Sequence, residues 1–177
     1  MLERMISDVK IECVKGDIAS QIGFTAVVNA ANAQLKRGGG VAGAIHRAAG
    51  PELEMECRRF APIRPGEAVI TKGYKLPNEY VIHCLGPVYG VDRPEDELLS
   101  RCYRNALDLA EKHRIDSVAF PALSTGFFGY PVKDAAEVAF RTIISMIPTL
   151  KHVKRIRFVL YSDSDYEVHK KVLSSII

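Results

Sequence analysis

The sequence predicts an α/β fold in which helices cover both faces of a central sheet. Three observations support this prediction: strand-like runs alternate with helix-like runs, several strand-like runs are continuously apolar, and no linker interrupts the series. Strands that are apolar on both faces are typical of a largely parallel sheet between two helical layers. We therefore expect residues 1–177 to form one three-layer α/β/α sandwich with a mixed, largely parallel sheet.

The first half of the chain supplies four of the expected strands and two short helices. Val41–Ala49 is predicted to be a helix that follows three glycines. Pro51–Phe60 is predicted to be a second helix, because proline is favoured at the first helical position. The expected strands are Lys10–Val14, Phe24–Asn29, Glu67–Thr71 and Tyr80–Leu85.

The second half begins with a long helix, predicted over Pro94–His113. Its apolar residues recur at helical spacing, and they are Leu98, Leu99, Cys102, Tyr103, Ala106, Leu107 and Ala110. The remaining elements are a strand at Ser117–Phe120, a loop at Pro121–Tyr130, a helix at Pro131–Ile147, a strand at Arg155–Tyr161 and a helix from Ser162 or Asp163 to Ser174.

Charge and composition limit the classes of function. Lysine and arginine number 24 against 21 acidic residues, for a net charge of +3. This mild excess suits an anionic ligand but falls short of a dedicated nucleic-acid binder. One basic run near the C-terminus is interpreted as a solvated patch, and it comprises Lys151, His152, Lys154, Arg155 and Arg157.

Targeting and cysteine patterns indicate a protein of a reducing compartment. No apolar run approaches the roughly 20 residues that span a bilayer, and Met1–Lys10 holds no signal-peptide core. We expect a cytoplasmic protein without a membrane partner. The four cysteines contain no C-x-x-C pair, so buried, reduced thiols are expected in place of disulfides or a zinc site.

Two loops stand where a ligand site is expected. In open α/β sheets, ligands bind beyond the carboxyl ends of the strands. Asn29–Asn32 and then Gly38–Gly40 follow one buried strand, and Ser124–Tyr130 follows another. Each loop leads into a helix, whose first N–H groups and dipole attract anions, although the glycines could also serve tight turns alone. The pair predicts a cradle for a phosphate or a pyrophosphate.

Several common site types are disfavoured. The nucleotide-triphosphate motif G-x-x-x-x-G-K-[ST] is absent. Gly38, Gly40 and Gly43 fit G-x-G-x-x-G, but they lie about nine residues beyond the strand, too far for the dinucleotide fingerprint. Ala122–Gly126 resembles a nucleophile elbow that lacks its first glycine, so a serine hydrolase is a weak alternative. No residue spacing suggests a catalytic metal.

Four polar or aromatic side chains are candidates near these loops. For Asn32 we favour a contact with sugar hydroxyls, and for Asn29 a structural hydrogen bond. Asp17 either caps a short helix that starts at Ile18 or accepts a hydrogen bond from an exocyclic amine. Tyr161 either stacks on a base or packs at the rim of the site.

Five short stretches together resemble the macro domain family of ADP-ribose-binding modules and ADP-ribosyl hydrolases. The stretches are Gly16-Asp17-Ile18, Val28-Asn29-Ala30-Ala31-Asn32, Gly38-Gly39-Gly40-Val41-Ala42-Gly43-Ala44-Ile45, His83-Cys84-Leu85-Gly86-Pro87 and Phe120-Pro121-Ala122-Leu123-Ser124-Thr125-Gly126. They occur in family order and, with Tyr161, cover the chain from about Gly16 onward. Each stretch alone is weak evidence for this resemblance, whereas the five stretches together are specific to the family.

The resemblance implies a role for each matching residue. The adenine would lie against Tyr161 and be recognised by Asp17 and the backbone of Ile18. Asn32 and Phe128 would hold the distal ribose and are the implied catalytic residues. The diphosphate would be clamped by the backbones of Gly39, Gly40, Val41, Ser124, Thr125, Gly126 and Phe127.

One departure concerns activity. Hydrolases of the bacterial and mitochondrial branch carry an acidic residue where this chain has Ala42, although other branches with alanine include hydrolases. Arg37 also departs from a small residue in that branch and would add a cation near the phosphates, unless it is simply a solvated arginine.

The resemblance still implies that the protein binds ADP-ribose and removes mono-ADP-ribose from acidic side chains, with deacetylation of O-acetyl-ADP-ribose as a related reaction. A non-catalytic reader of ADP-ribose or poly(ADP-ribose) ends is the alternative. The expected partners are ADP-ribose and ADP-ribosylated proteins; no cofactor or metal is implied, and a monomer is expected.

Overall fold

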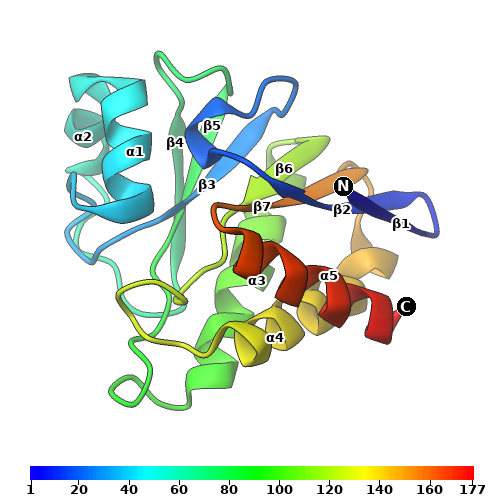
Figure 1. The fold of residues 1–177 in the computed structure, drawn as a ribbon. Coiled ribbons are helices and arrows are strands. Elements are labelled where there is room, and N and C mark those ends of the chain that lie inside the picture. The colour runs from blue at the N-terminus through cyan, green and yellow to red at the C-terminus, as the bar shows by residue number, and fades with distance from the viewer.

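A computed structural model describes residues 1–177, and its seven-stranded sheet lies between two layers of helices (Figure 1). The strands are β1 (Leu2–Ile6), β2 (Val9–Lys15), β3 (Ala26–Ala30), β4 (Ala68–Lys72), β5 (Tyr80–Cys84), β6 (Ser117–Phe120) and β7 (Arg155–Leu160). The helices are α1 (Gly40–Ala49), α2 (Pro51–Cys57), α3 (Glu95–Lys112), α4 (Val132–Met146) and α5 (Asp163–Ile176), with 3-10 turns η1 (Ile18–Ser20) and η2 (Ile147–Thr149).

The sheet is mixed and largely parallel, as predicted. Its strand order is β1-β2-β7-β6-β3-β5-β4. The five inner strands run parallel, while β1 and β4 pair antiparallel at the two edges. Because parallel strands all end on the same side, the segments that follow β2, β7, β6, β3 and β5 meet along one edge of the sheet.

Two hydrophobic cores hold the layers together. In Figure 1, α1 and α2 stand on one side of the sheet, and α3, α4 and α5 cover the other. The larger core has 32 buried residues and includes the neighbouring rings of Phe120, Phe140 and Phe158. The smaller core has 15 buried residues and joins α1 and α2 to the sheet through residues such as Ile45 and Leu53. This arrangement confirms the α/β/α sandwich.

The predicted elements correspond to the observed ones within a few residues, with one exception. The sequence predicts no strand before Lys10, yet β1 pairs with β2 through a register that aligns Arg4 with Ile11. β1 alternates half-buried and exposed residues at the edge of the sheet. Two charged residues, Glu3 and Arg4, interrupt its apolar residues, so β1 lacks the continuous apolar signal of the inner strands.

The basic run at the start of β7 is only partly a solvated patch. Arg155 and Arg157 both pair with Glu12, whose side chain is fully buried. Their guanidinium groups also lie over the ring of Phe24, 4.5 and 4.6 Å from its centroid. Burial alone would raise the pKa of Glu12, but the hydrogen bonds from the two arginines outweigh burial and hold it below its ordinary value. The cluster therefore joins β2 to β7.

The four cysteines are buried and unpaired, which agrees with the expected thiols. Burial raises the pKa of the Cys57 thiol to about 12, so this thiol stays protonated and unreactive. Each helix is too short or too polar to cross a bilayer.

Candidate functional site

Strand order decides which loops become neighbours at the carboxyl edge. β2 lies beside β7, so Asp17 and Tyr161, which follow these strands, come together at one end. β6 lies between β7 and β3, which places its loop at the centre. The segments after β3 and β5 lie at the other end, where Asn32 and Gly86 line the same surface. The edge therefore has two halves that meet at the β6 loop.

The near cleft occupies the half beside β2 and β7 and has a volume of about 590 Å³. Asp17, Ile18 and Tyr161 form part of its wall, together with Thr125 from the β6 loop. The other lining residues are Gly16, Gly40, Val41, Ala44, Arg47, Pro121, Ala122, Gly126, Val159, Leu160 and Asp165. Its charged lining residues are Asp17, Arg47 and Asp165.

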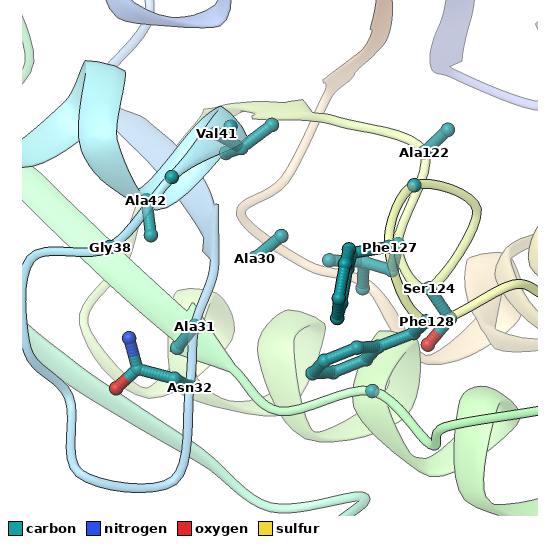
Figure 2. A pocket seen from close by; sticks show the side chains of 15 residues that line it. Ala30, Ala31, Asn32, Gly38, Val41, Ala42, Ala122, Ser124, Phe127 and Phe128 are labelled. Atoms are coloured by element: carbon teal, nitrogen blue, oxygen red, sulfur yellow. The ribbon is translucent and has the colours of Figure 1, made fainter.

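The distal cleft has a volume of about 430 Å³. Figure 2 shows Asn32 and Ala42 on one side and Phe127 and Phe128 on the other. The remaining lining residues are Ala30, Ala31, Gly38, Gly39, Gly40, Val41, Gly86, Ala122, Leu123, Ser124 and Gly126. The two clefts share Gly40, Val41, Ala122 and Gly126, so they adjoin each other at the two glycine loops.

The first glycine loop ends at the N-terminus of α1. Gly39 is the N-cap, and Gly40 begins the helix with a φ of +54°, a conformation that favours glycine. Gly43 also needs its missing side chain, because a Cβ there would lie 2.4 Å from the Gly38 carbonyl oxygen. The first-turn N–H groups of α1 have no intrahelical acceptors, and Gly40 and Val41 line both clefts. This end can bind an anion.

The second loop is tightly folded by its own hydrogen bonds. The N–H of Tyr130 donates to the Ser124 carbonyl oxygen at 2.9 Å, and the N–H of Gly129 donates to the Gly126 carbonyl oxygen at 3.0 Å. Ser124 has a φ of +66° and a buried hydroxyl without a hydrogen-bond partner. A Cβ on Gly86 would lie 2.1 Å from that hydroxyl oxygen. The glycine therefore lets the segment after β5 pass directly against the loop.

Asn32 lines the distal cleft and also closes its own loop. Its Nδ2 donates to the Lys36 carbonyl at 2.7 Å, and its Oδ1 accepts from the Lys36 N–H at 3.0 Å. A carboxamide has one further N–H and one further lone pair, which remain available to a ligand. Opposite, Phe128 is half-buried, and its carbonyl accepts from the N–H of Tyr89 at 2.8 Å.

Asp17 performs the capping role predicted for it. Its Oδ1 accepts from the N–H of Ala19 at 2.9 Å, at the start of η1. The carboxylate is exposed and lines the near cleft, so its second oxygen is available to a ligand. Tyr161 and Phe127 are also exposed, with 87% and 104% relative accessibility, and present their rings at the rims of the clefts.

All twelve residues proposed from the sequence line one cleft or the other, so the fold brings the complete predicted set together. Arg37 is different, since it lines neither cleft and its backbone N–H donates to Glu54 at 3.0 Å. Sequence reasoning missed Arg47 and Asp165 as lining residues. Arg47 follows Val41 and Ala44 at a spacing of three, which is the signal that could have placed it on the same helix face.

A chain of buried polar groups lies next to the distal cleft. Asn29, which precedes Ala30 of the cleft, donates from Nδ2 to His83 Nδ1 at 3.1 Å. His83 in turn donates from Nε2 to Thr71 Oγ1 at 2.9 Å. Desolvation, with a smaller effect of His46, lowers the pKa of His83 to about 3. The structural role predicted for Asn29 is confirmed, and His83 is neutral.

The charged groups of the site are few and unevenly placed. No ionisable side chain lines the distal cleft. The near cleft has two carboxylates, Asp17 and Asp165, and one cation, Arg47. The distal cleft therefore offers shape, backbone amides and the Asn32 carboxamide, and it holds no side-chain acid or base.

These features define a class of protein: an α/β/α sandwich with two adjoining, glycine-lined clefts at the carboxyl edge of its parallel strands. The chain belongs to the macro domain family, whose model matches residues 28–139. A macro domain-containing protein of Chlorobaculum tepidum is 47% identical over 97% of this chain and 99% of its own length.

Other relatives have more specific names. A protein of Salmonella typhimurium named O-acetyl-ADP-ribose deacetylase is 44% identical over 93% of this chain and 94% of its own length. The Oceanobacillus iheyensis macrodomain with ADP matches with a TM-score of 0.93 and 39% identity, covering 99% of this chain and 95% of that one. The Trypanosoma brucei macrodomain in complex with ADP-ribose has a TM-score of 0.86 and 36% identity, covering 92% and 68%.

Proposed function

We propose that this protein binds ADP-ribose along the joined clefts. The single observation that carries the proposal is that the two clefts adjoin each other and share Gly40, Val41, Ala122 and Gly126. A nucleoside, a diphosphate and a second sugar form a ligand of the same linear order. Solved relatives that hold ADP and ADP-ribose support this choice.

In the proposed complex, the near cleft takes the adenosine, with Asp17 and the Ile18 backbone at the adenine and Tyr161 against its face. The distal ribose lies between Asn32 and Phe128. The backbones of the two loops bind the diphosphate, and these are Gly39, Gly40, Val41, Ser124, Thr125, Gly126 and Phe127. Preformed N–H groups stabilise phosphate charge without reorganisation.

The proposed reaction is hydrolysis at the distal ribose. Water attacks C1 of the ribose as the bond to the carboxylate oxygen of a modified acidic side chain breaks, which releases ADP-ribose and the free side chain. No side chain of the distal cleft can take the proton of the water, so the ligand's own phosphate accepts it. The protein contributes orientation through Asn32 and electrostatic preorganisation through the loops.

The same site suits a second ester. In O-acetyl-ADP-ribose, water adds to the acetyl carbonyl, and acetate and ADP-ribose leave. Relatives 42–44% identical to this chain are named O-acetyl-ADP-ribose deacetylase, which supports this activity. We further propose that residues 1–177 act as a single macro domain, as a monomer, on ADP-ribosylated proteins.

A specific observation favours one other function, that of a non-catalytic reader of ADP-ribose or poly(ADP-ribose) ends. Ala42 lines the distal cleft at the position where some family members carry an acidic residue, and no other acid replaces it. A reader would bind ADP-ribose in the same clefts without turnover.

Single-turnover release of ADP-ribose from a glutamate-modified protein distinguishes the two functions. Titration calorimetry with ADP-ribose on the same preparation is the control for a competent site. We expect both binding and release, with acetate release from O-acetyl-ADP-ribose in a parallel assay. Binding of ADP-ribose without release of ADP-ribose or acetate would support the non-catalytic reader. The absence of ADP-ribose binding would contradict the whole proposal.

A further inference from the structure

Arg47 is the single basic side chain among the residues that line the two joined clefts. It lies on α1, three residues beyond Ala44 and six residues beyond Val41, and all three residues line the near cleft. Residues three apart share one face of a helix. Arg47 therefore extends the wall that begins at the glycine loop.

The position of the guanidinium depends on a neighbouring glycine. Nη1 of Arg47 lies 3.0 Å from the point that a Cβ on Gly43 would occupy. The side chain thus folds back along the first turn of α1, toward the glycine loop and away from the C-terminus of the helix. The missing side chain of Gly43 leaves room for the guanidinium there.

Arg47 also has no partner within the protein. Its guanidinium makes no hydrogen bond and no ion pair. By contrast, Arg59, Arg101, Arg155 and Arg157 each pair with a glutamate. The charges that share the near cleft are Asp17, from the turn after β2, and Asp165, from α5. An unpaired guanidinium has all five of its N–H donors available.

We propose that Arg47, in addition to the backbone N–H groups of the two loops, contributes to the preference of this site for adenosine derivatives carrying a diphosphate over the uncharged nucleoside. This inference rests on the proposed function and deepens it. Without Arg47, the joined clefts would present two carboxylates and no cation to a ligand with two negative charges. A guanidinium stays charged at all working pH values and matches phosphate oxygens in geometry.

The test compares ligands that differ only beyond the nucleoside. Calorimetric affinities of adenosine, ADP and ADP-ribose are measured for the wild type and for Arg47→Gln, at low and high salt. At low salt we expect Arg47→Gln to lose roughly two- to fivefold affinity for ADP and ADP-ribose, the range for a partly solvated charge pair. Adenosine affinity should not change. High salt should reduce the difference in ADP and ADP-ribose affinity between the wild type and Arg47→Gln, because salt screens exposed charges.

Two further variants serve as controls. Arg47→Lys keeps the charge and should retain most of the affinity for ADP-ribose. Arg104→Gln removes the same charge from the exposed face of α3 and should leave all affinities unchanged.

Each contrary result has a distinct meaning. Unchanged ADP-ribose affinity in Arg47→Gln would overturn the inference while leaving the proposed function intact. An equal loss for adenosine would also overturn it and would assign Arg47 to packing against the nucleoside. An equal loss of ADP-ribose affinity in Arg104→Gln would also overturn the inference, because the loss would then come from the net charge of the protein. A wild type that binds no ADP-ribose would overturn the proposed function and this inference together.

Discussion

Asp17 has two roles that substitution can separate. Its Oδ1 caps η1 through the N–H of Ala19, while the exposed residue also lines the near cleft. We expect Asp17→Ala to weaken ADP-ribose binding by roughly 1–3 kcal/mol, the cost of leaving a hydrogen-bond donor without its partner. Calorimetry measures this change.

The variant Asp17→Asn separates the loss of the N-cap of η1 from the loss of the carboxylate at the adenine. Asparagine is an equally good N-cap, so this variant should keep the melting temperature of the wild type while losing the carboxylate at the adenine. If both variants bind ADP-ribose as the wild type does, Asp17 is a structural residue only.

At Asn32, turnover and binding should respond differently. Asn32→Ala should lower the rate of ADP-ribose release more than it lowers affinity, because the proposed role is to orient the distal ribose for attack. The measurement is kcat alongside the calorimetric Kd. Asn32→Asp is a second variant, which keeps the oxygen that accepts from the Lys36 N–H but loses the Nδ2 donor and adds a negative charge to the distal cleft. Equal losses of turnover and affinity would make Asn32 a simple ligand contact.

At the scale of elements, the site depends on the close approach of the segment after β5 to the loop after β6. Gly86→Ala would place a Cβ 2.1 Å from the Ser124 hydroxyl oxygen. We expect a loss of roughly 1–3 kcal/mol in the free energy of unfolding, as for other overpacked sites. ADP-ribose affinity should fall as well, because the displaced loop carries diphosphate-binding backbone. Chemical denaturation and calorimetry measure the two effects.

The double variant Gly86→Ala with Ser124→Gly provides the control. It removes the clashing hydroxyl, and glycine suits the φ of +66° at position 124. Most of the lost stability should return, which would reveal coupling between the two positions. Additive losses would show that the contact between them is unimportant.

At the scale of the whole molecule, buried histidines couple stability to pH. The pKa of His83 is about 3 in the folded state because of desolvation and His46, against about 6.5 in an unfolded chain. Above pH 6.5 the group is neutral in both states. As the pH falls below 6.5, the unfolded chain takes up a proton that the folded protein refuses, so His83 makes the free energy of unfolding fall by about 1.4 kcal/mol per pH unit.

Variants separate this effect from the other titrating groups. Desolvation also lowers the pKa of His46 and His169, so both act in the same direction. His83→Gln should reduce the slope of the wild type between pH 6 and pH 4 by about 1.4 kcal/mol per pH unit. Urea denaturation at several pH values measures both slopes. An unchanged slope in His83→Gln would contradict the neutral, buried state of His83.

The sequence by itself determined the elements and the fold class. Apolar continuity marks the inner strands, helical spacing marks α3 and α4, and glycines beside helix starts mark both loops. These signals are local, because strand and helix periods involve residues close in sequence. β1 was not predicted, because the charged Glu3 and Arg4 interrupt the apolar residues of this short edge strand.

Only the tertiary structure decided which of these parts meet. The order β2-β7-β6-β3-β5 brings Asp17 beside Tyr161 and joins the two clefts. In the folded protein, Arg155 also pairs with the buried Glu12, Arg47 lines the near cleft and Gly86 lies against the loop after β6. Strand order and close approach depend on packing between residues far apart in the chain, so no local pattern specifies them.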